Sequence, residues 1–274
     1  MQPLVPQNNE SGFSQEQLLT IEKLKDPAYL PSLAELELVF KQHASQAYTE
    51  KKFEDSPFKK TSELFRQYEG GKGIFESLGR KYEIWNKEYI DHFSDYLAKR
   101  ILDMHPNDKA VILEVAAGNG TLSYFLKRSL DEKIPGRFDI IATDSGDWNI
   151  KHVSGVEVID YKEALVKYKP DIILTSWMPM NEDFTQAYRD CPSVKEYILI
   201  GNTIDTGSKK TWGGKHPNIE TTSEFKARVK DLVMDGFVHN ESEEVSGLAK
   251  FQNVKGYIND RPSTESFIRK TELV

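Results

Sequence analysis

The stretch ILEVAAGNGTLSYFLKR, from Ile112 to Arg128, determines how the second half of the chain is expected to fold. It begins as an apolar run, passes through two glycines two residues apart, and continues with helical spacing. This pattern predicts a buried strand, a tight glycine turn and a helix. Backbone amides at the start of such a helix favour negatively charged or strongly polar ligand groups. A tight turn alone does not explain the acid Glu114 inside the apolar run.

Short apolar runs alternate with helical stretches from Asn107 onward. Strands that alternate with helices predict an α/β fold, in which a mostly parallel sheet is covered on both faces. The final stretch PSTESFIRKTEL, residues 262–273, is expected to be a last strand at the antiparallel edge of that sheet. The predicted strands that precede it are AVILEVA, RFDIIATD, VEVID, DIILTSW and KEYILIGN.

The first third of the chain has a different character. Residues 1–15 are polar and are expected to form a loose arm, and the pattern is helical from Ser14 to about Met104. Ser14 is a candidate N-cap, and Ser32 with Glu35 matches a capping box. The sequence therefore predicts two domains, a helical cap over residues 1–105 and a doubly wound α/β domain over residues 106–274.

Composition excludes several classes of protein. The 274 residues carry a formal net charge of −7, so a general nucleic-acid binder is not expected. The single cysteine, Cys191, permits no intrachain disulfide and favours a reducing compartment. No secretory signal and no apolar run of about 20 residues is present, so we expect a soluble cytoplasmic protein that has no membrane partner. No pair of Cys or His residues has metal-ligand spacing, so no metal site is predicted.

Three ligand classes use a glycine turn of this kind. A phosphate-binding loop needs GxxxxGK[ST], which neither AAGNGT nor EGGKGI supplies. A dinucleotide fingerprint needs a third small residue, whereas Gly118 and Gly120 are followed by the polar Ser123. The third class is S-adenosyl-L-methionine (SAM).

The segment LEVAAGNGTLS resembles motif I of the class I SAM-dependent methyltransferases, [DE]-x-G-x-G-x-G. Its positions are Glu114, Ala116, Gly118 and Gly120, so alanine stands at the first glycine position. The resemblance covers about residues 107–274 and implies a Rossmann-like sheet. It also implies that SAM is the cofactor and S-adenosyl-L-homocysteine the product.

The resemblance implies roles for individual residues. Glu114 would orient the ammonium group of the cofactor, directly or through water, and Asp144 would bind both ribose hydroxyls. Asp160 and Tyr161 would contact the adenine. The complete expected cofactor site comprises Glu114, Ala116, Gly118, Gly120, Asp144, Ser145, Trp148, Asp160, Tyr161 and Ser176. The expected substrate contacts are Trp177, Met178, Trp212, Tyr82 and Trp85.

Simpler interpretations remain open for several of these residues. Asp160 is also a plausible N-cap for the helix that follows, and Asp144 for one near Asp147. The aromatic residues before the first strand match a buried helix face. The loop over residues 205–218 is either a solvated loop or a lid, and its His216 is the candidate general base.

The sequence thus predicts a methyltransferase that acts on a nitrogen or oxygen nucleophile of a small molecule. Two alternatives stay open: an NAD(P)-dependent oxidoreductase on a similar sheet, and a non-catalytic SAM-binding or assembly protein. The first alternative predicts a Tyr-x-x-x-Lys pair or an equivalent, which we do not find.

Overall fold

The computed structural model describes most of the α/β region and part of the helical region. The described residues are 13–40, 66, 78, 83–147, 150, 152–153, 155–201, 206–208, 211–212, 235–240, 242–252 and 262–272. The chain divides into two compact units, Met1–Glu88 with Asn253–Asn259, and Tyr89–Gln252 with Asp260–Val274. The functional boundary expected at residue 105 stays a prediction.

Two short helices of the first unit are described in full, α1 (Gln15–Leu24) and α2 (Leu33–Phe40). Both predicted caps are confirmed. Ser14 accepts a hydrogen bond from the Gln17 amide, while the Gln17 side chain accepts one from Ser14 N. The Glu35 amide donates to Ser32 Oγ, and Ser32 N donates back to the Glu35 carboxylate. One face of each helix contributes to a buried cluster of Phe13, Leu18, Ile21, Leu24, Leu36, Val39, Phe40, Leu78 and Ile84.

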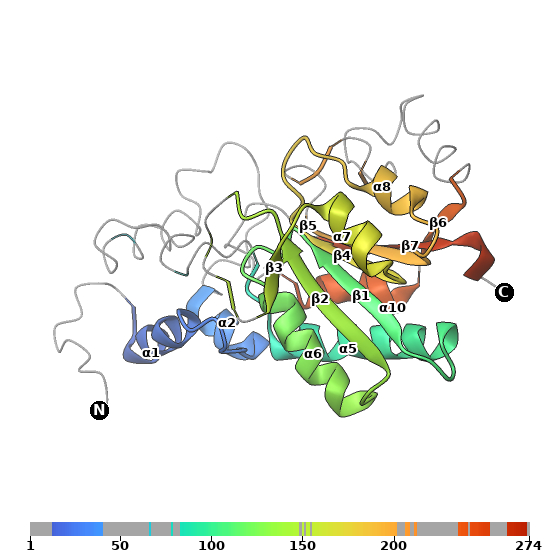
Figure 1. The fold of residues 1–274 in the computed structure, drawn as a ribbon. Helices are drawn as coiled ribbons and strands as arrows, with labels where there is room; N and C mark the ends of the chain where they lie inside the picture. The colour runs from blue at the N-terminus through green and yellow to red at the C-terminus, as the bar shows by residue number, and fades with distance from the viewer. Residues whose placement is uncertain are drawn as a thin grey trace, which may run out of the picture. The chain divides into compact units, whose positions relative to one another are not determined.

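The second unit is a seven-stranded sheet with strand order β3-β2-β1-β4-β5-β7-β6 (Figure 1). Strands β1 to β5 are parallel, and β7 is antiparallel to both β5 and β6. The strands are β1 (Ala110–Val115), β2 (Phe138–Asp144), β3 (Val156–Val158), β4 (Ile172–Ser176), β5 (Glu196–Gly201), β6 (Phe237–Asn240) and β7 (Ser263–Arg269). The described helices are α5 (Lys87–Met104), α6 (Thr121–Lys133), α7 (Tyr161–Tyr168), α8 (Thr185–Asp190) and α10 (Glu243–Ser246), together with the 3₁₀ helices η3 (Gly247–Lys250) and η4 (Lys270–Glu272).

This sheet confirms the predicted fold class, a mostly parallel Rossmann-like sheet with an antiparallel C-terminal strand. One detail of the prediction was wrong. The C-terminal strand β7 lies between β5 and β6, so β6 forms the edge. Residues 237–240 carry no clear strand signal in the sequence, because FVHN is short and follows a helical pattern.

Alternate residues of each strand face opposite helical layers. Helices α7 and α8 cover one face, where a buried cluster includes Leu113, Leu165, Tyr188, Tyr197 and Phe267. Helices α5, α6 and α10 lie against the other face (Figure 1). There the carboxylate of Glu196, which is fully buried, accepts hydrogen bonds from Tyr96, Arg100 and Ser266. These bonds join α5 to β5 and β7.

The helix before β1 is shorter than expected. The sequence pattern is helical up to about Met104, but α5 begins at Lys87 and residues 83–86 have no regular structure. Trp85 is therefore not on a helix, although it is buried. In α5 the expected apolar face is confirmed, since Tyr89, Phe93, Tyr96 and Ile101 are buried. No helix among the described residues is both long enough and apolar enough to cross a membrane.

Candidate functional site

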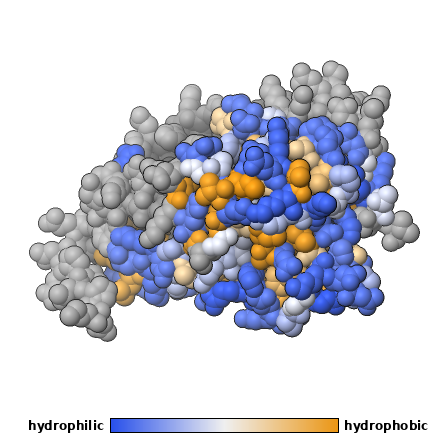
Figure 2. Space-filling model, viewed as in Figure 1, coloured by the Kyte–Doolittle hydropathy of each residue, from blue (hydrophilic) through white to orange (hydrophobic). Residues whose placement is uncertain are grey.

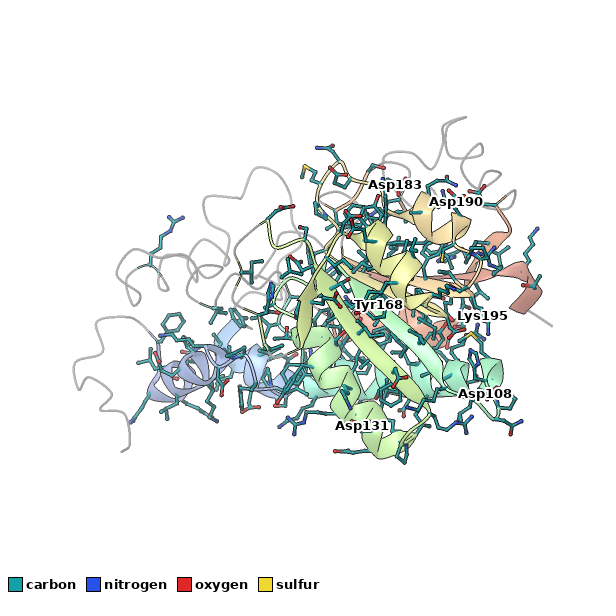
Figure 3. The ribbon with its side chains drawn as sticks, viewed as in Figure 1. Asp108, Asp131, Tyr168, Asp183, Asp190 and Lys195 are labelled. Atoms are coloured by element: carbon teal, nitrogen blue, oxygen red, sulfur yellow. The ribbon has the colours of Figure 1, made fainter. Side chains whose placement is uncertain are left out.

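The candidate site lies where the strand order reverses. The chain proceeds outward from β1 to β3 on one side and from β4 to β5 on the other. In open α/β sheets, ligands bind beyond the carboxyl ends of the strands at such a switch point. The segments that follow β1, β2 and β4 meet there. Figure 3 shows Asp183, in the loop after β4, near this end of the strands, whereas Lys195 lies before β5 at the opposite end.

The loop between β1 and α6 has a left-handed backbone at three positions. Ala116, Gly118 and Gly120 have φ angles of 51°, 55° and 77°. A Cβ at Gly120 would lie 2.3 Å from Val156 Cγ2, so both conformation and crowding require glycine there. A Cβ at Gly118 would meet only Ile150 Cδ1, at 4.0 Å. Gly118 is therefore required for its conformation, while the space beside it is open.

Four amides of this loop and of the first turn of α6 are already bonded within the chain. The amide of Ala117 donates to Thr143 O, and that of Gly120 donates to Ala117 O, both at 2.9 Å. The Gly118 amide donates to Asp144 Oδ2 at 2.9 Å, and the Thr121 amide donates to Asn119 Oδ1 at 3.1 Å. These four donors are therefore not directed together at an external anion.

Asp144 connects two of the loops. It is the last residue of β2 and is only 9 % exposed. Its Oδ2 accepts the Gly118 amide from the loop after β1, and its Oδ1 accepts the Gly146 amide at 2.9 Å. Each carboxylate oxygen has a further lone pair for a ligand hydroxyl. The described residues 145–147 form no helix that Asp144 could cap. Asp144 instead accepts the amide of Gly146, two residues ahead.

Glu114 lies behind the loop, buried in β1 with 1 % of its surface exposed. Its Oε2 accepts a hydrogen bond of 3.1 Å from Ser123 N in the first turn of α6. The pKa of the Glu114 carboxyl is raised to about 7. Burial is the main cause, the hydrogen bonds from Ser123 oppose the shift, and the nearby Asp144 carboxylate adds to it. The Glu114 carboxyl therefore holds the start of α6 against β1, and burial favours its neutral form up to about pH 7.

Asp160 has the simpler role that the sequence left open. It lies two residues beyond β3, where its side chain accepts the Lys162 amide at 2.8 Å and caps α7. The ring of Tyr161 stacks on Phe184, with ring centroids 4.2 Å apart and planes 23° apart. Contacts of Asp160 and Tyr161 with adenine stay a prediction.

The loop after β4 is also bent into left-handed conformations, with φ angles of 55° at Trp177 and 69° at Asn181. Two backbone bonds join this loop to the segment after β5: Gly207 N donates to Met178 O at 3.0 Å, and Asn181 N donates to Gly207 O at 2.8 Å. Non-glycine residues in this region of backbone space are strained, and such strain gathers at functional sites.

Two of the expected substrate contacts are buried in this arrangement. Met178 is 2 % exposed, and Trp212 is 3 % exposed with its indole N–H donating to Thr206 O at 2.9 Å. Both belong to the cluster beneath α7 and α8, so the structure gives them a packing role. Their proposed contact with substrate stays a prediction.

The remaining expected residues are placed as follows. Ser145 is exposed after β2, Ser176 is half-buried at the end of β4, and Trp85 belongs to the first compact unit. Tyr82, Trp148 and His216 lie outside the described residues.

Sequence reasoning missed several residues that shape these loops. The side-chain oxygen of Asn119 accepts hydrogen bonds from the amide and the hydroxyl of Thr121. Its backbone carbonyl oxygen accepts one from the Val153 amide at 2.8 Å. Asp183 accepts the Thr185 amide and the hydroxyls of Thr185 and Thr211. The Asn-x-Thr and Asp-x-Thr spacings were available as signals, because both residue types cap the turn two residues ahead.

The surface near β3 and α7 includes exposed apolar side chains. Val158 and Val166 are 63 % and 75 % exposed. Figure 2 shows hydrophobic surface gathered on the viewed face, in the area where Figure 1 places β3. In contrast, the described residues contain no cluster of three or more His, Cys, Asp or Glu side chains that would hold a metal ion.

Comparisons with known proteins give only distant likenesses. No family model and no curated protein matches the chain. Among solved structures, a CurJ carbon methyltransferase is 12% identical over 93% of this chain and 91% of its own, with a TM-score of 0.45. A DszA carbon methyltransferase is 14% identical over 93% and 69%, with a TM-score of 0.40. Magnesium protoporphyrin IX methyltransferase from Synechocystis PCC 6803, with bound SAM, is 11% identical over 82% and 100%, with a TM-score of 0.37. At these levels of similarity, the fold assignment rests on the sheet topology itself.

Proposed function

We propose that this chain is a SAM-dependent methyltransferase whose cofactor lies over the loop between β1 and α6. One observation carries the proposal: the glycine loop is bordered by two buried acidic side chains, Glu114 and Asp144, while the amides of Ala117, Gly118, Gly120 and Thr121 are bonded internally. A phosphate site needs several amides directed at the ligand. This loop instead offers negative charge and carboxylate acceptors, which suit a cationic nucleoside that has no phosphate.

The same observation argues against the nicotinamide alternative. A dinucleotide places its pyrophosphate on the glycine loop at the helix N-terminus. Here the amides of Gly118, Gly120 and Thr121 have intramolecular acceptors, and the two nearby carboxylates would repel a pyrophosphate. Asp144 alone does not discriminate, because a ribose is common to both cofactors.

The residues of the loop fit the proposed cofactor. Asp144 has lone pairs left for a ribose diol, and the open space beside Gly118 permits close approach to the backbone. When ionised, Glu114 would favour the ammonium and sulfonium charges through its field, because its burial leaves no surface for direct contact in this conformation, and a bound cation would in turn favour its ionised form. SAM supplies an already activated methyl group. The protein then has to hold a nucleophile in line with that methyl group and exclude water.

We further propose that the substrate is a small molecule with a nitrogen or oxygen nucleophile, approached from the loop after β4. The strained Trp177 and the half-buried Ser176 border that approach. The net charge of −7 favours such a substrate over a nucleic acid. A general base is required only if the nucleophile arrives protonated, and His216 is the candidate that the sequence offers.

Isothermal titration calorimetry with SAM, S-adenosylhomocysteine and NAD tests the proposal. SAM and its product are expected to bind, and Asp144→Ala is expected to weaken both by about tenfold or more through loss of the ribose acceptor. Asp139→Ala is the matched control, since Asp139 lies on the same strand but is exposed. Binding of NAD without binding of SAM would overturn the proposal. Transfer of labelled methyl from SAM to small molecules in a cell extract would then distinguish an enzyme from a non-catalytic SAM-binding protein.

A further inference from the structure

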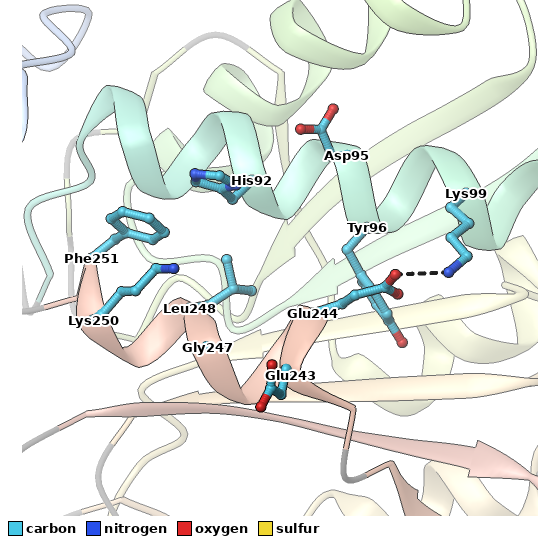
Figure 4. Close-up of a pocket in the computed structure, with 10 residues that line it drawn as sticks. All are labelled: His92, Asp95, Tyr96, Lys99, Glu243, Glu244, Gly247, Leu248, Lys250 and Phe251. Atoms are coloured by element: carbon cyan, nitrogen blue, oxygen red, sulfur yellow. Dashed lines mark hydrogen bonds and ion pairs between the residues drawn. The ribbon is translucent and has the colours of Figure 1, made fainter.

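A pocket of about 270 Å³ lies between α5 and the α10–η3 segment. None of its lining residues belongs to the loops of the proposed cofactor site. Figure 4 shows His92, Tyr96 and Lys99 on the α5 side, and Gly247, Leu248, Lys250 and Phe251 on the other. Its second wall comes from the connection between β6 and β7, residues 241–262, which is 22 residues long. Antiparallel neighbours need only about two to five residues.

Gly247 gives an independent reason to regard this pocket as a site. Its φ and ψ angles are −67° and −16°, which any residue adopts, and a Cβ built there would meet nothing within 4 Å. Gly247 is the C-cap residue of α10 and the first residue of η3. Neither backbone conformation nor crowding therefore explains the glycine. An occupant that lies along Gly247 in the pocket would explain it.

The charges at one end of the pocket select the occupant. The ring of His92 stacks on Phe251, with centroids 4.6 Å apart and planes 10° apart, and Lys250 Nζ lies 4.7 Å from the Phe251 centroid. No described carboxylate forms an ion pair with Lys250, so its ammonium is available to an anion. Three acids line the pocket. Glu244 pairs with Lys99 at 2.7 Å, Asp95 pairs with Lys133 at 2.5 Å, and Glu243 lies at the α10 end, away from Lys250 (Figure 4).

The middle of the pocket is apolar or open, because Leu248 is buried there and Gly247 has no side chain. In Figure 4, Lys250 and His92 converge at the Phe251 end of the groove, and Leu248 lies beside them. We propose that this pocket binds a small organic carboxylate, with its carboxylate between Lys250 and His92 and its apolar body along Leu248 and Gly247. This site is separate from the proposed cofactor site and does not depend on it.

Titration with 4-phenylbutyrate in the absence of SAM, followed by the NMR signals of the Leu248 methyl groups and the His92 ring, tests the proposal. Saturable binding is expected. The neutral analogue 4-phenylbutanol and the Lys250→Gln variant are each expected to bind about fivefold more weakly, because one exposed charge pair is lost. Gly247→Leu should abolish binding by filling the pocket.

Two variants serve as matched controls. Ala249→Leu adds the same side chain to the same 3₁₀ helix at an exposed position outside the pocket lining, and Lys127→Gln removes a lysine elsewhere that also lies over an aromatic ring. Both should bind like the wild type. The proposal is overturned if the wild type shows no saturable binding, if the alcohol binds as well as the acid, or if Lys250→Gln binds unchanged. If Gly247→Leu fails to fold, the comparison of Lys250→Gln with the wild type still tests whether the pocket binds the carboxylate.

Discussion

The amide of Gly118 donates a 2.9 Å hydrogen bond to Asp144 Oδ2, which ties the loop after β1 to the end of β2. The other oxygen of Asp144 holds Gly146 N. The same carboxylate that is proposed to bind ribose thus also organises the loops around it. Structure and ligand binding are therefore expected to depend on Asp144 together.

Asp144→Asn tests whether loop stability and ligand binding both depend on this carboxylate. The carboxamide retains one acceptor oxygen, but its NH₂ group faces an amide donor. We therefore expect a loss of about 1–3 kcal/mol in unfolding free energy, together with weaker SAM binding. Denaturant unfolding and calorimetry measure the two effects. Asp139→Asn, at an exposed position on the same strand, should stay within about 0.5 kcal/mol of wild type. An unchanged stability in Asp144→Asn would mean that the two loop bonds contribute nothing.

The raised pKa of Glu114 predicts that the unfolding free energy depends on pH. Its pKa is raised to about 7 in the folded protein, above its ordinary value of 4.5. Between these values the folded state binds more protons than the unfolded state, so stability falls as pH rises. The contribution amounts to about 3 kcal/mol, is fully present below pH 4.5, and is lost by about pH 7.

Glu114→Gln isolates this effect, because the amide oxygen can still accept Ser123 N but does not titrate. The difference in unfolding free energy between wild type and variant should decrease from about pH 4.5 to 7 and then level off. Denaturation curves across that range measure it. A difference that stays constant with pH would show that Glu114 titrates normally.

Ala116 occupies the first glycine position of the motif with a φ angle of 51°. The left-handed conformation costs a non-glycine residue about 1–2 kcal/mol, partly offset by the greater freedom of glycine in the unfolded chain. Ala116→Gly should therefore raise the unfolding free energy by about 0.5–1 kcal/mol. The neighbouring Ala117 does not have a positive φ angle, so Ala117→Gly should lower it by a similar amount. Equal effects of the two substitutions would contradict the assigned backbone.

Gly118 and Gly120 are expected to respond differently to alanine. At Gly120 the added Cβ meets Val156 Cγ2 at 2.3 Å, so strain and overlap together should cost about 2–4 kcal/mol of stability. At Gly118 only the conformational strain applies, because the nearest atom is 4.0 Å away. The added methyl would instead occupy the space proposed for the cofactor. Gly118→Ala should thus weaken SAM binding in a protein that remains folded. Full SAM affinity in that variant would place the cofactor elsewhere.

The strand and helix pattern was predictable because each parallel strand is a short apolar run bounded by turn residues, as in Ile172–Ser176. The position of β7 was not, since strand order depends on tertiary packing. Residues 83–86, which include Trp85, have the apolar spacing of a helix, yet they form no regular secondary structure.

The site was predictable in part for similar reasons. Gly120 follows β1 and Asp144 ends β2, and these positions can be recognised in the sequence because each follows a short apolar run. The hydrogen bonds that join the loops after β4 and β5, at Met178 and Gly207, connect distant segments whose spacing carries no signal. The burial of Trp212 is likewise a result of tertiary packing.

Asp160 offers the sharpest separation of a structural role from a binding role. It caps α7 by accepting the Lys162 amide, and its replacement by alanine should cost about 1 kcal/mol. Asparagine caps a helix about as well as aspartate, so Asp160→Asn should keep the stability of the wild type. If Asp160 also accepts the adenine amino group, the variant should bind SAM less tightly, because an anionic acceptor has become neutral. If it acts as a cap alone, Asp160→Asn will match the wild type in both stability and SAM affinity, and the adenine contact must come from another residue. Denaturant unfolding and calorimetry on the same protein samples distinguish the two outcomes.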